Sequence, residues 1–185
     1  MARLYGKRIM LREYRRDDFA AMRRWVNDPE VTNLLSDVFL YAHSEPATTA
    51  FLEGAMAGGS DHKGFVIADL QSESYIGQID LFRLDWKNRS AELGLVIGVK
   101  ELFGQGYGTE AIRLMRSFVF YRMNLRRLYL QVYDYNTRAY RCYLKCGFRE
   151  EGRLREAHYY NGRYHDIILM SVLRNDVMQG EGIGF

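Results

Sequence analysis

Proline, cysteine and long hydrophobic runs are scarce in this sequence, and each scarcity excludes a class of protein. With two prolines in 185 residues, 48% hydrophobic and 26% charged, the chain has the composition neither of a disordered segment nor of a coiled coil. No run approaches the roughly 20 apolar residues of a membrane-spanning helix, and the N-terminal residues lack the apolar core of a secretion signal. We therefore expect a cytoplasmic protein with no membrane partner.

The two cysteines, Cys142 and Cys146, lie four residues apart in a helical pattern. A disulfide within one helical turn would be unusual, and two thiols without nearby histidines make a poor metal site. We expect free thiols in a reducing compartment and no bound metal. His158 and His165 are expected at the surface of a hairpin rather than at a metal.

Net charge is also small. The formal charge is +3, and the basic residues are scattered among acids, so no nucleic-acid partner is predicted, although a polyanionic cofactor would be suited. The length of 185 residues is enough for one well-buried domain.

Hydrophobic periodicity alternates between strand-like and helix-like segments along the chain. Strands are predicted at 8–13, 65–68, 75–82, 91–97, 128–133, 154–158 and 164–173, and the hairpin dipeptide Asn161-Gly162 joins the last two. Helices are predicted at 16–26, 45–56 and 137–146, and another follows residue 108 and ends near Met123. This order predicts one mixed-sheet α/β domain over residues 1–174 with helices on both faces, and a loose, glycine-rich tail over 175–185.

A glycine-rich turn, Phe103-Gly-Gln-Gly-Tyr-Gly108, lies between a predicted strand and a helix-forming segment. Its alternate glycines let the backbone turn tightly and approach a ligand with main-chain N–H groups. A helix that begins there adds donors and a partial positive charge, which suit an anion such as a phosphate. Gly108 is followed by Thr109-Glu110, which excludes a P-loop, and the glycine spacing fails the dinucleotide fingerprint. A phosphate cradle of another kind and a purely structural turn both remain open.

A second candidate segment, Asn136-Thr-Arg-Ala-Tyr-Arg-Cys-Tyr143, follows the next predicted strand. On a helix, Ala139 and Tyr143 share one face, and Asn136 lies one turn earlier at the cap position. A tyrosine hydroxyl keeps its proton at neutral pH and can act as a general acid. By itself the pattern also fits a packing aromatic among the 14 tyrosines of the chain.

Together, the two segments resemble the GNAT superfamily of acetyl-CoA-dependent N-acetyltransferases. The resemblance extends over residues 7–173, and it implies a mixed, mostly antiparallel twisted sheet of about seven strands with helices on both faces. Four further stretches look like the branch of ribosomal-protein N-terminal (alanine/serine) acetyltransferases, of which polyamine and antibiotic-related amine acetyltransferases are near relatives. These stretches are Ile9-Met-Leu-Arg-Glu13, Trp25-x-x-Asp28, Ala91-Glu-Leu-Gly94 and Tyr164-x-Asp166.

The resemblance also implies where coenzyme A binds. The amides of the glycine turn would hold the pyrophosphate, and the strand before the turn would pair with the pantetheine amides. Phe103 stands where the family pattern has Gln or Arg, but since the contact is mainly with backbone we expect binding to survive. Gln105, Arg138 and Lys145 are candidates for side chains near the phosphates. The expected contacts with acetyl-CoA are Leu95, Val96, Ile97, Val99, Phe103, Gly104, Gln105, Gly106, Tyr107, Gly108, Thr109, Asn136, Arg138, Tyr143 and Lys145.

The chemistry implied is direct transfer within a ternary complex, which needs no nucleophilic side chain. Tyr143 would protonate the departing CoA thiolate, and Asn136 would hydrogen-bond near the pantetheine arm. Glu92 is the candidate general base, or the organiser of a water that serves as one, because burial beside the acetyl site would raise its pKa towards the working range. A solvated glutamate on an alternating strand is the alternative for Glu92.

In this family the acceptor pocket is formed by the first two helices and the last hairpin. Here those segments carry many aromatics and an acid, which suit an amine through cation–π contacts and charge pairing, although most of these aromatics could equally belong to the core. The expected set is Trp25, Phe39, Tyr41, Phe82, Trp86, Tyr159, Tyr160 and Asp166.

We expect the acceptor to be a protein or peptide N-terminal α-amine, with a polyamine or another small amine, antibiotics included, as the alternative. A polyamine site needs several carboxylates, and the region around Asp37 and Glu45 offers few. An acyl-CoA-binding sensor without activity is an alternative of another class, and retention of Asn136 with Tyr143 argues against it. The oligomeric state is open, with a homodimer or a higher homo-oligomer among the alternatives.

Overall fold

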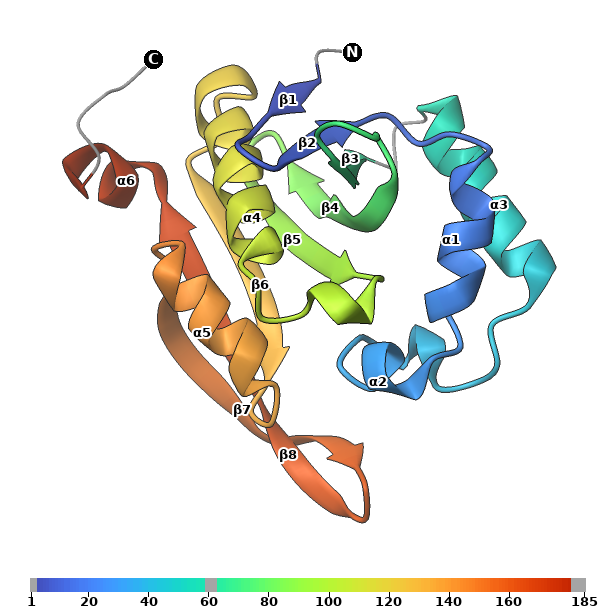
Figure 1. Ribbon diagram of the computed structural model, residues 1–185. Helices are drawn as coiled ribbons and strands as arrows, with labels where there is room; N and C mark the ends of the chain where they lie inside the picture. The colour runs from blue at the N-terminus through green and yellow to red at the C-terminus, as the bar shows by residue number, and fades with distance from the viewer. Residues whose placement is uncertain (1–2, 59–62, 181–185) are drawn as a thin grey trace. The chain divides into compact units, whose positions relative to one another are not determined.

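The computed structural model describes residues 3–58 and 63–180, and the chain divides into two compact units. The first unit contains Met1–Phe82 and Gly94–Leu114, and the second contains Arg83–Leu93 and Met115–Phe185. Strands β4 (Tyr75–Asp85) and β5 (Ser90–Ile97) and helix α4 (Tyr107–Ser117), all labelled in Figure 1, each contribute residues to both units.

The first unit combines antiparallel strands with short helices, and local side chains cap the N-termini of α2 and α3. Asp28 Oδ1 accepts from Glu30 N (3.0 Å) at the start of α2, and Ser44 Oγ accepts from Ala47 N (3.3 Å) at the start of α3, as expected for N-cap residues. The elements are β1 (Leu4–Tyr5), β2 (Ile9–Arg12), α1 (Asp18–Trp25), α2 (Pro29–Thr32), the 3-10 turn η1 (Asp37–Phe39), α3 (Glu45–Ala57), β3 (Lys63–Asp69) and β4 (Tyr75–Asp85).

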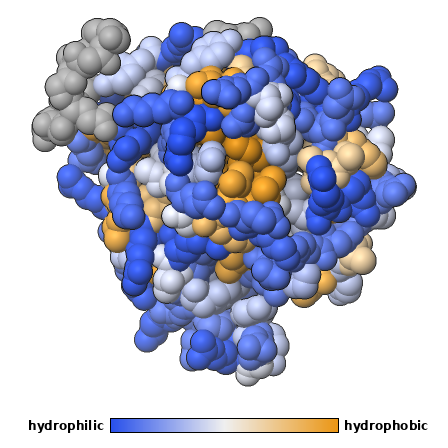
Figure 2. Space-filling view, viewed as in Figure 1, coloured by the Kyte–Doolittle hydropathy of each residue, from blue (hydrophilic) through white to orange (hydrophobic). Residues whose placement is uncertain are grey.

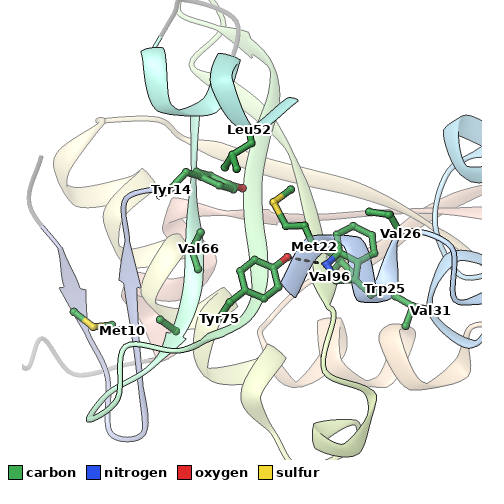
Figure 3. Packing of buried hydrophobic residues seen from close by; sticks show 11 residues of the cluster. Met10, Tyr14, Met22, Trp25, Val26, Val31, Leu52, Val66, Tyr75 and Val96 are labelled. Carbon is green, nitrogen blue, oxygen red and sulfur yellow. Dashed lines mark hydrogen bonds between the residues drawn. The ribbon is translucent and has the colours of Figure 1, made fainter. Parts of the chain in front are cut away.

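The core of the first unit forms where α1 and α3 pack against the strands (Figure 3). Trp25 is 3% exposed, and its indole Nε1 donates to the hydroxyl of Tyr75 (3.0 Å). The chain of buried hydrogen bonds continues from Tyr75 OH to Gln78 Oε1 (3.1 Å) and from Gln78 Nε2 to Asp80 (3.2 Å). These bonds satisfy polar groups that would otherwise be costly to bury.

The second unit is built on a long β-hairpin and helix α5. The hairpin turn places Asn161 (φ 50°) and Gly162 (φ 82°) in the left-handed region, as the Asn-Gly dipeptide predicts. Helix α5 starts after Asn136 and ends before Gly147, whose φ is 85°. The elements are β6 (Arg127–Tyr133), α5 (Thr137–Lys145), β7 (Arg149–Tyr160), β8 (Arg163–Leu173) and α6 (Arg174–Gly180), with a π-helical turn η3 (Phe118–Arg122) directly after α4.

Eight strands follow the order β1-β2-β3-β4-β5-β6-β8-β7. Strands β5 and β6 pair in parallel from Ser90↔Arg127 to Glu92↔Tyr129, whereas β1 to β3 and β6 to β8 have antiparallel neighbours. The predicted α/β fold with a mixed, mostly antiparallel sheet is confirmed.

Two local features differ from the prediction. The sheet has an eighth strand, β1, because Leu4–Tyr5 pairs with Met10–Leu11 across a tight turn. Residues 175–180 of the expected loose tail continue helix α6, since Val177 is buried and the Asp176 carboxylate accepts from Leu173 N (3.1 Å). The remaining tail residues, 181–185, lie outside the described residues.

Hydrophilic side chains predominate on the face that Figure 2 shows, with hydrophobic ones in smaller patches. Within residues 3–58 and 63–180, no helix is both long and apolar enough to cross a membrane.

Candidate active site

The glycine turn of the first unit has the geometry of an anion cradle. Gly104 (φ 74°) and Gly106 (φ 86°) both have positive φ, and α4 begins at Tyr107. Glu110 N donates to Gly106 O (3.0 Å), so the preceding N–H groups belong to the first turn, where a helix offers no internal acceptor. Gly108 lies inside the helix. Two glycines therefore shape the turn, and the helix supplies further donors.

Arg8 is the residue at this turn that the sequence reasoning missed. Its guanidinium donates from Nη1 to Gln105 O (3.0 Å) and from Nε to Glu110 (3.2 Å), and it lies 4.4 Å from the ring centroid of Tyr107. Glu110 in turn accepts from the backbone N–H groups of Lys7 and Arg8. Burial acts to raise the pKa of Glu110, but these hydrogen bonds outweigh it and lower the pKa.

No local signal could have revealed this contact. Arg8 and Glu110 are 102 residues apart. In the sequence, Arg8 is only the first polar residue of a predicted strand with alternating polar and apolar residues.

The end of β5 leads into the glycine turn and is held by β4. Val96 is buried in the core of the first unit, whereas Leu95 and Ile97 are half-buried. The N–H groups of Gly98 and Val99 both donate to Ile76 O, at 2.9 and 3.2 Å.

Helix α5 and its cap place four of the predicted residues in the second unit: Asn136, Arg138, Tyr143 and Lys145. Asn136 caps the helix, and its Oδ1 accepts from Ala139 N (3.2 Å), so the amide nitrogen is the group left to donate to a ligand. Tyr143 is 7% exposed, and burial, with smaller contributions from Cys142 and Cys146, raises its pKa. The phenol is therefore protonated at neutral pH, which is the state that a general acid needs.

All three side chains proposed for the phosphates are exposed. Gln105 is exposed, and its amide donates to Glu101 O (2.6 Å). Arg138 and Lys145 are exposed on α5. Phe103 is partly buried against the core of the first unit, and Thr109 lies in the first turn of α4.

Glu92 has an ion-pair partner. Its Oε2 lies 3.3 Å from Arg83 Nη1, and the exposed fraction is 17% for the Glu92 side chain and 70% for that of Arg83. Arg83 has a positive φ of 47°, so this pair depends on an unusual backbone conformation at the end of β4. Arg83 is thus the counterion of the Glu92 carboxylate, and a base role for Glu92 stays a prediction.

The aromatic acceptor residues of the first unit do not share one environment. Trp25 belongs to the core, which corrects its expected place in a pocket wall, because its indole is buried and hydrogen-bonded to Tyr75. Phe39 packs against the same core and stacks on His43 at 5.6 Å. Tyr41 is exposed, and Phe82 is half-exposed.

In the second unit, aromatic rings gather around the end of β6 and the β7–β8 hairpin. Tyr135 stacks on Tyr160 (4.9 Å), and its hydroxyl lies 3.2 Å from His158 Nε2. The ring of His158 stacks on Tyr133 (3.9 Å). Of the predicted residues, Tyr160 belongs to this group, whereas Trp86 and Tyr159 are exposed. Tyr133 and Tyr135 escaped prediction because they read as ordinary residues at a strand end.

The carboxylate of Asp134 reaches these rings through His165, whose ring packs edge-on against Tyr135 (4.6 Å). Asp134 accepts from Asp166 N (3.1 Å) and lies 2.8 Å from His165 Nδ1. Burial acts to raise the pKa of Asp134, but the Asp166 N–H and His165 outweigh it and lower the pKa. His165 is 5% exposed, so its expected place at the hairpin surface was wrong. Arg163 Nε donates to His165 Nε2 (3.1 Å), so both ring nitrogens of the buried imidazole have partners.

A family model described as the acetyltransferase (GNAT) domain matches residues 8–149. The chain belongs to the GNAT acetyltransferase family. The match covers β2 to the start of β7, with both the glycine turn and the Asn136–Tyr143 segment inside it. The resemblance found in the sequence is therefore confirmed at the level of the family.

Individual relatives carry two kinds of name. A spermidine N(1)-acetyltransferase from Vibrio cholerae is 36% identical over 111 residues, which are 60% of this chain and 63% of that protein. A candidate ribosomal N-acetyltransferase from Bacillus subtilis, YdaF, is 33% identical over 117 residues, 63% of each chain. In both cases the chain spans less than two thirds of the relative's length.

A solved structure covers more of the fold. The crystal structure of spermidine N-acetyltransferase from Vibrio cholerae in complex with CoA and spermine aligns with a TM-score of 0.79 and 27% identity, over 91% of this chain and 97% of that one. The relatives thus do not single out the ribosomal branch that the sequence motifs favoured.

Proposed function

We propose that this protein transfers the acetyl group of acetyl-CoA to a primary amine by direct attack of the amine on the thioester. The observation that carries the proposal is Tyr143, a buried tyrosine kept protonated on a helix capped by Asn136. A chain that only bound acyl-CoA would have no use for a leaving-group acid.

The residues of the first unit fit the anionic part of coenzyme A. The positive-φ glycines and the first turn of α4 present N–H donors, and the guanidinium of Arg8 lies against the same turn. Helix N-termini and arginine are recurrent partners of phosphate groups. On β5, the ladder with β6 covers only Ser90–Glu92 among the described residues, so later backbone groups on that edge can pair with the pantetheine amides.

In the proposed reaction, Tyr143 acts as general acid and Glu92 as general base. The amine nitrogen forms a bond to the thioester carbonyl carbon, the carbon–sulfur bond breaks, and the Tyr143 hydroxyl gives its proton to the departing thiolate. The proton lost by the amine passes to Glu92, directly or through a water. One positioned acid or base of this kind contributes a rate factor of about 100 to 10,000.

For the acceptor, we propose a polyamine or similar small amine first. Tyr135, Tyr160 and His158 form a stacked group, and the Asp134 carboxylate reaches this group through His165, whose ring packs edge-on against Tyr135 at 4.6 Å. Aromatic faces with nearby carboxylates attract ammonium groups. Asp134 supplies negative charge that was not among the residues predicted from the sequence. The names of the Vibrio cholerae relatives support the same class. A peptide N-terminal α-amine is the second candidate, supported by the branch motifs and by YdaF.

The test is an acetyl-CoA turnover assay that detects the released thiol, with spermidine, spermine, aminoglycosides and peptides beginning with alanine or serine as acceptors. We expect thiol release with at least one primary amine, and the preferred amine distinguishes the two acceptor classes. Binding of acetyl-CoA in a calorimeter without turnover on any amine would refute the proposal and favour the sensor.

A further inference from the structure

The turn between β1 and β2 and the first turn of α4 are joined by Glu110. Its Oε1 accepts from two successive backbone N–H groups, those of Lys7 (2.6 Å) and Arg8 (2.9 Å). This approach requires the glycine at position 6, since a Cβ there would lie 2.5 Å from Glu110 Oε1. Glu110 therefore fixes where the side chain of Arg8 starts.

From that start, the Arg8 guanidinium reaches over the glycine turn. Nε pairs with Glu110 (3.2 Å), Nη1 donates to the carbonyl of Gln105 (3.0 Å), and the plane of the group covers the ring of Tyr107 (4.4 Å). Nη2 would lie 3.4 Å from a Cβ placed on Gly106. The described hydrogen bonds engage Nε and Nη1 and leave Nη2 directed at the turn.

We propose that Arg8 is a further binding and positioning residue for the pyrophosphate of acetyl-CoA, and this rests on the function proposed above. Its bond to Gln105 O holds the peptide that lies between two positive-φ glycines, Gly104 and Gly106. Its charge and its remaining donors contact the phosphate oxygens. Arginine suits both tasks because its planar fork can make several fixed hydrogen bonds at once.

The first experiment measures acetyl-CoA binding by calorimetry for the wild type, Arg8→Ala and Arg8→Lys. Loss of one hydrogen-bonded charge predicts a Kd about 10- to 100-fold weaker for Arg8→Ala. Arg8→Lys should recover only part of the affinity, because an ammonium keeps the charge but cannot bond Glu110 and Gln105 O with one rigid group. Arg3→Ala is the matched control: Arg3 pairs with Glu13 and Glu73 in the same unit, and its loss should leave the Kd unchanged.

The second experiment separates phosphate binding from a general structural role. Acetyl-pantetheine carries the thioester and the pantetheine amides but no pyrophosphate, so its kcat/KM should be the same for the wild type and for Arg8→Ala. The proposal for Arg8 is overturned if Arg8→Ala binds acetyl-CoA like the wild type, or if both donors lose kcat/KM equally. If the wild type does not bind acetyl-CoA, the proposed function falls as well, and the two failures are thereby distinguishable.

Discussion

Substitution of Gly98 by alanine should destabilise the first unit strongly. Gly98 lies at the end of β5, and a Cβ there would be 2.8 Å from Nε1 and 2.9 Å from Cγ of Trp25, with Cδ1 closer still. The ring cannot withdraw easily, because it is 3% exposed and donates a hydrogen bond to Tyr75. The new methyl group and the indole therefore compete for one volume.

The magnitude follows from the distances. Carbon contacts are favourable at about 3.5–4.0 Å, so the ring or strand must shift by roughly 1 Å. Overpacking of this kind costs about 1–3 kcal/mol, and weakening the buried bond from Trp25 to Tyr75 adds about 1 kcal/mol. The lower entropy of unfolded alanine offsets about 0.4–1 kcal/mol. The free energy of unfolding should therefore fall by about 1–3.5 kcal/mol.

Urea unfolding followed by circular dichroism measures this change, and Gly54→Ala is the matched control. Gly54 lies within α3, and a Cβ there meets nothing within 4 Å. Because alanine is the better helix former, Gly54→Ala should raise stability by about 0.5–1 kcal/mol. If Gly98→Ala unfolds within about 0.5 kcal/mol of the wild type at an unchanged m-value, in the range of an ordinary surface change, the packing argument around Trp25 is wrong.

Three further predictions concern single side chains. Tyr143→Phe should lower turnover by about 100- to 10,000-fold, while the acetyl-CoA affinity measured by calorimetry stays constant. Because burial raises the pKa of Tyr143, the wild-type pH–rate profile should show no loss of activity from ionisation of Tyr143 near neutral pH. Unchanged turnover in Tyr143→Phe would remove Tyr143 from the mechanism. Glu92→Gln should lower turnover by about 100- to 10,000-fold, as expected for loss of one positioned base, and unchanged turnover would return Glu92 to a structural role with Arg83. Glu151→Gln should lower the free energy of unfolding by about 0.2–1 kcal/mol at neutral pH, the range of exposed ion pairs. The hydrogen bond from Arg127 lowers the pKa of Glu151 from 4.5 to about 2, so this contribution is complete above pH 4.5 and is lost as the pH falls towards 2; a difference between wild type and variant that is independent of pH in urea unfolding would contradict it.

The parts of the fold that were predictable are those with local causes. Asn136 caps α5 through a bond to the N–H three residues on, and Asn161-Gly162 turns the hairpin through positive φ angles. Both signals lie within a few residues, and so does the alternation that marked the strands. The two motifs of the candidate site could be found in this way, and the family match contains both.

The side-chain contacts around these motifs could not be predicted from local sequence. Trp25 fits a pocket wall and a core equally well until the close approach of Gly98 and the hydroxyl of Tyr75 decide for the core. His165 is polar and sits near a turn, yet Asp134 and Arg163 satisfy both ring nitrogens and allow it to be buried. Side-chain burial depends on partners, and partners distant in sequence leave no local pattern.

By itself, the sequence determined the elements and the two chemical segments, because backbone angles, caps and hydrophobic period are set by neighbouring residues. Only the tertiary structure decided that Arg8, rather than a residue of the turn itself, reaches over the glycine turn, that Glu92 is paired with Arg83, and that Asp134 reaches the ring of Tyr135 through His165. Each of these contacts joins residues from different elements, and its geometry is fixed by how those elements pair and pack.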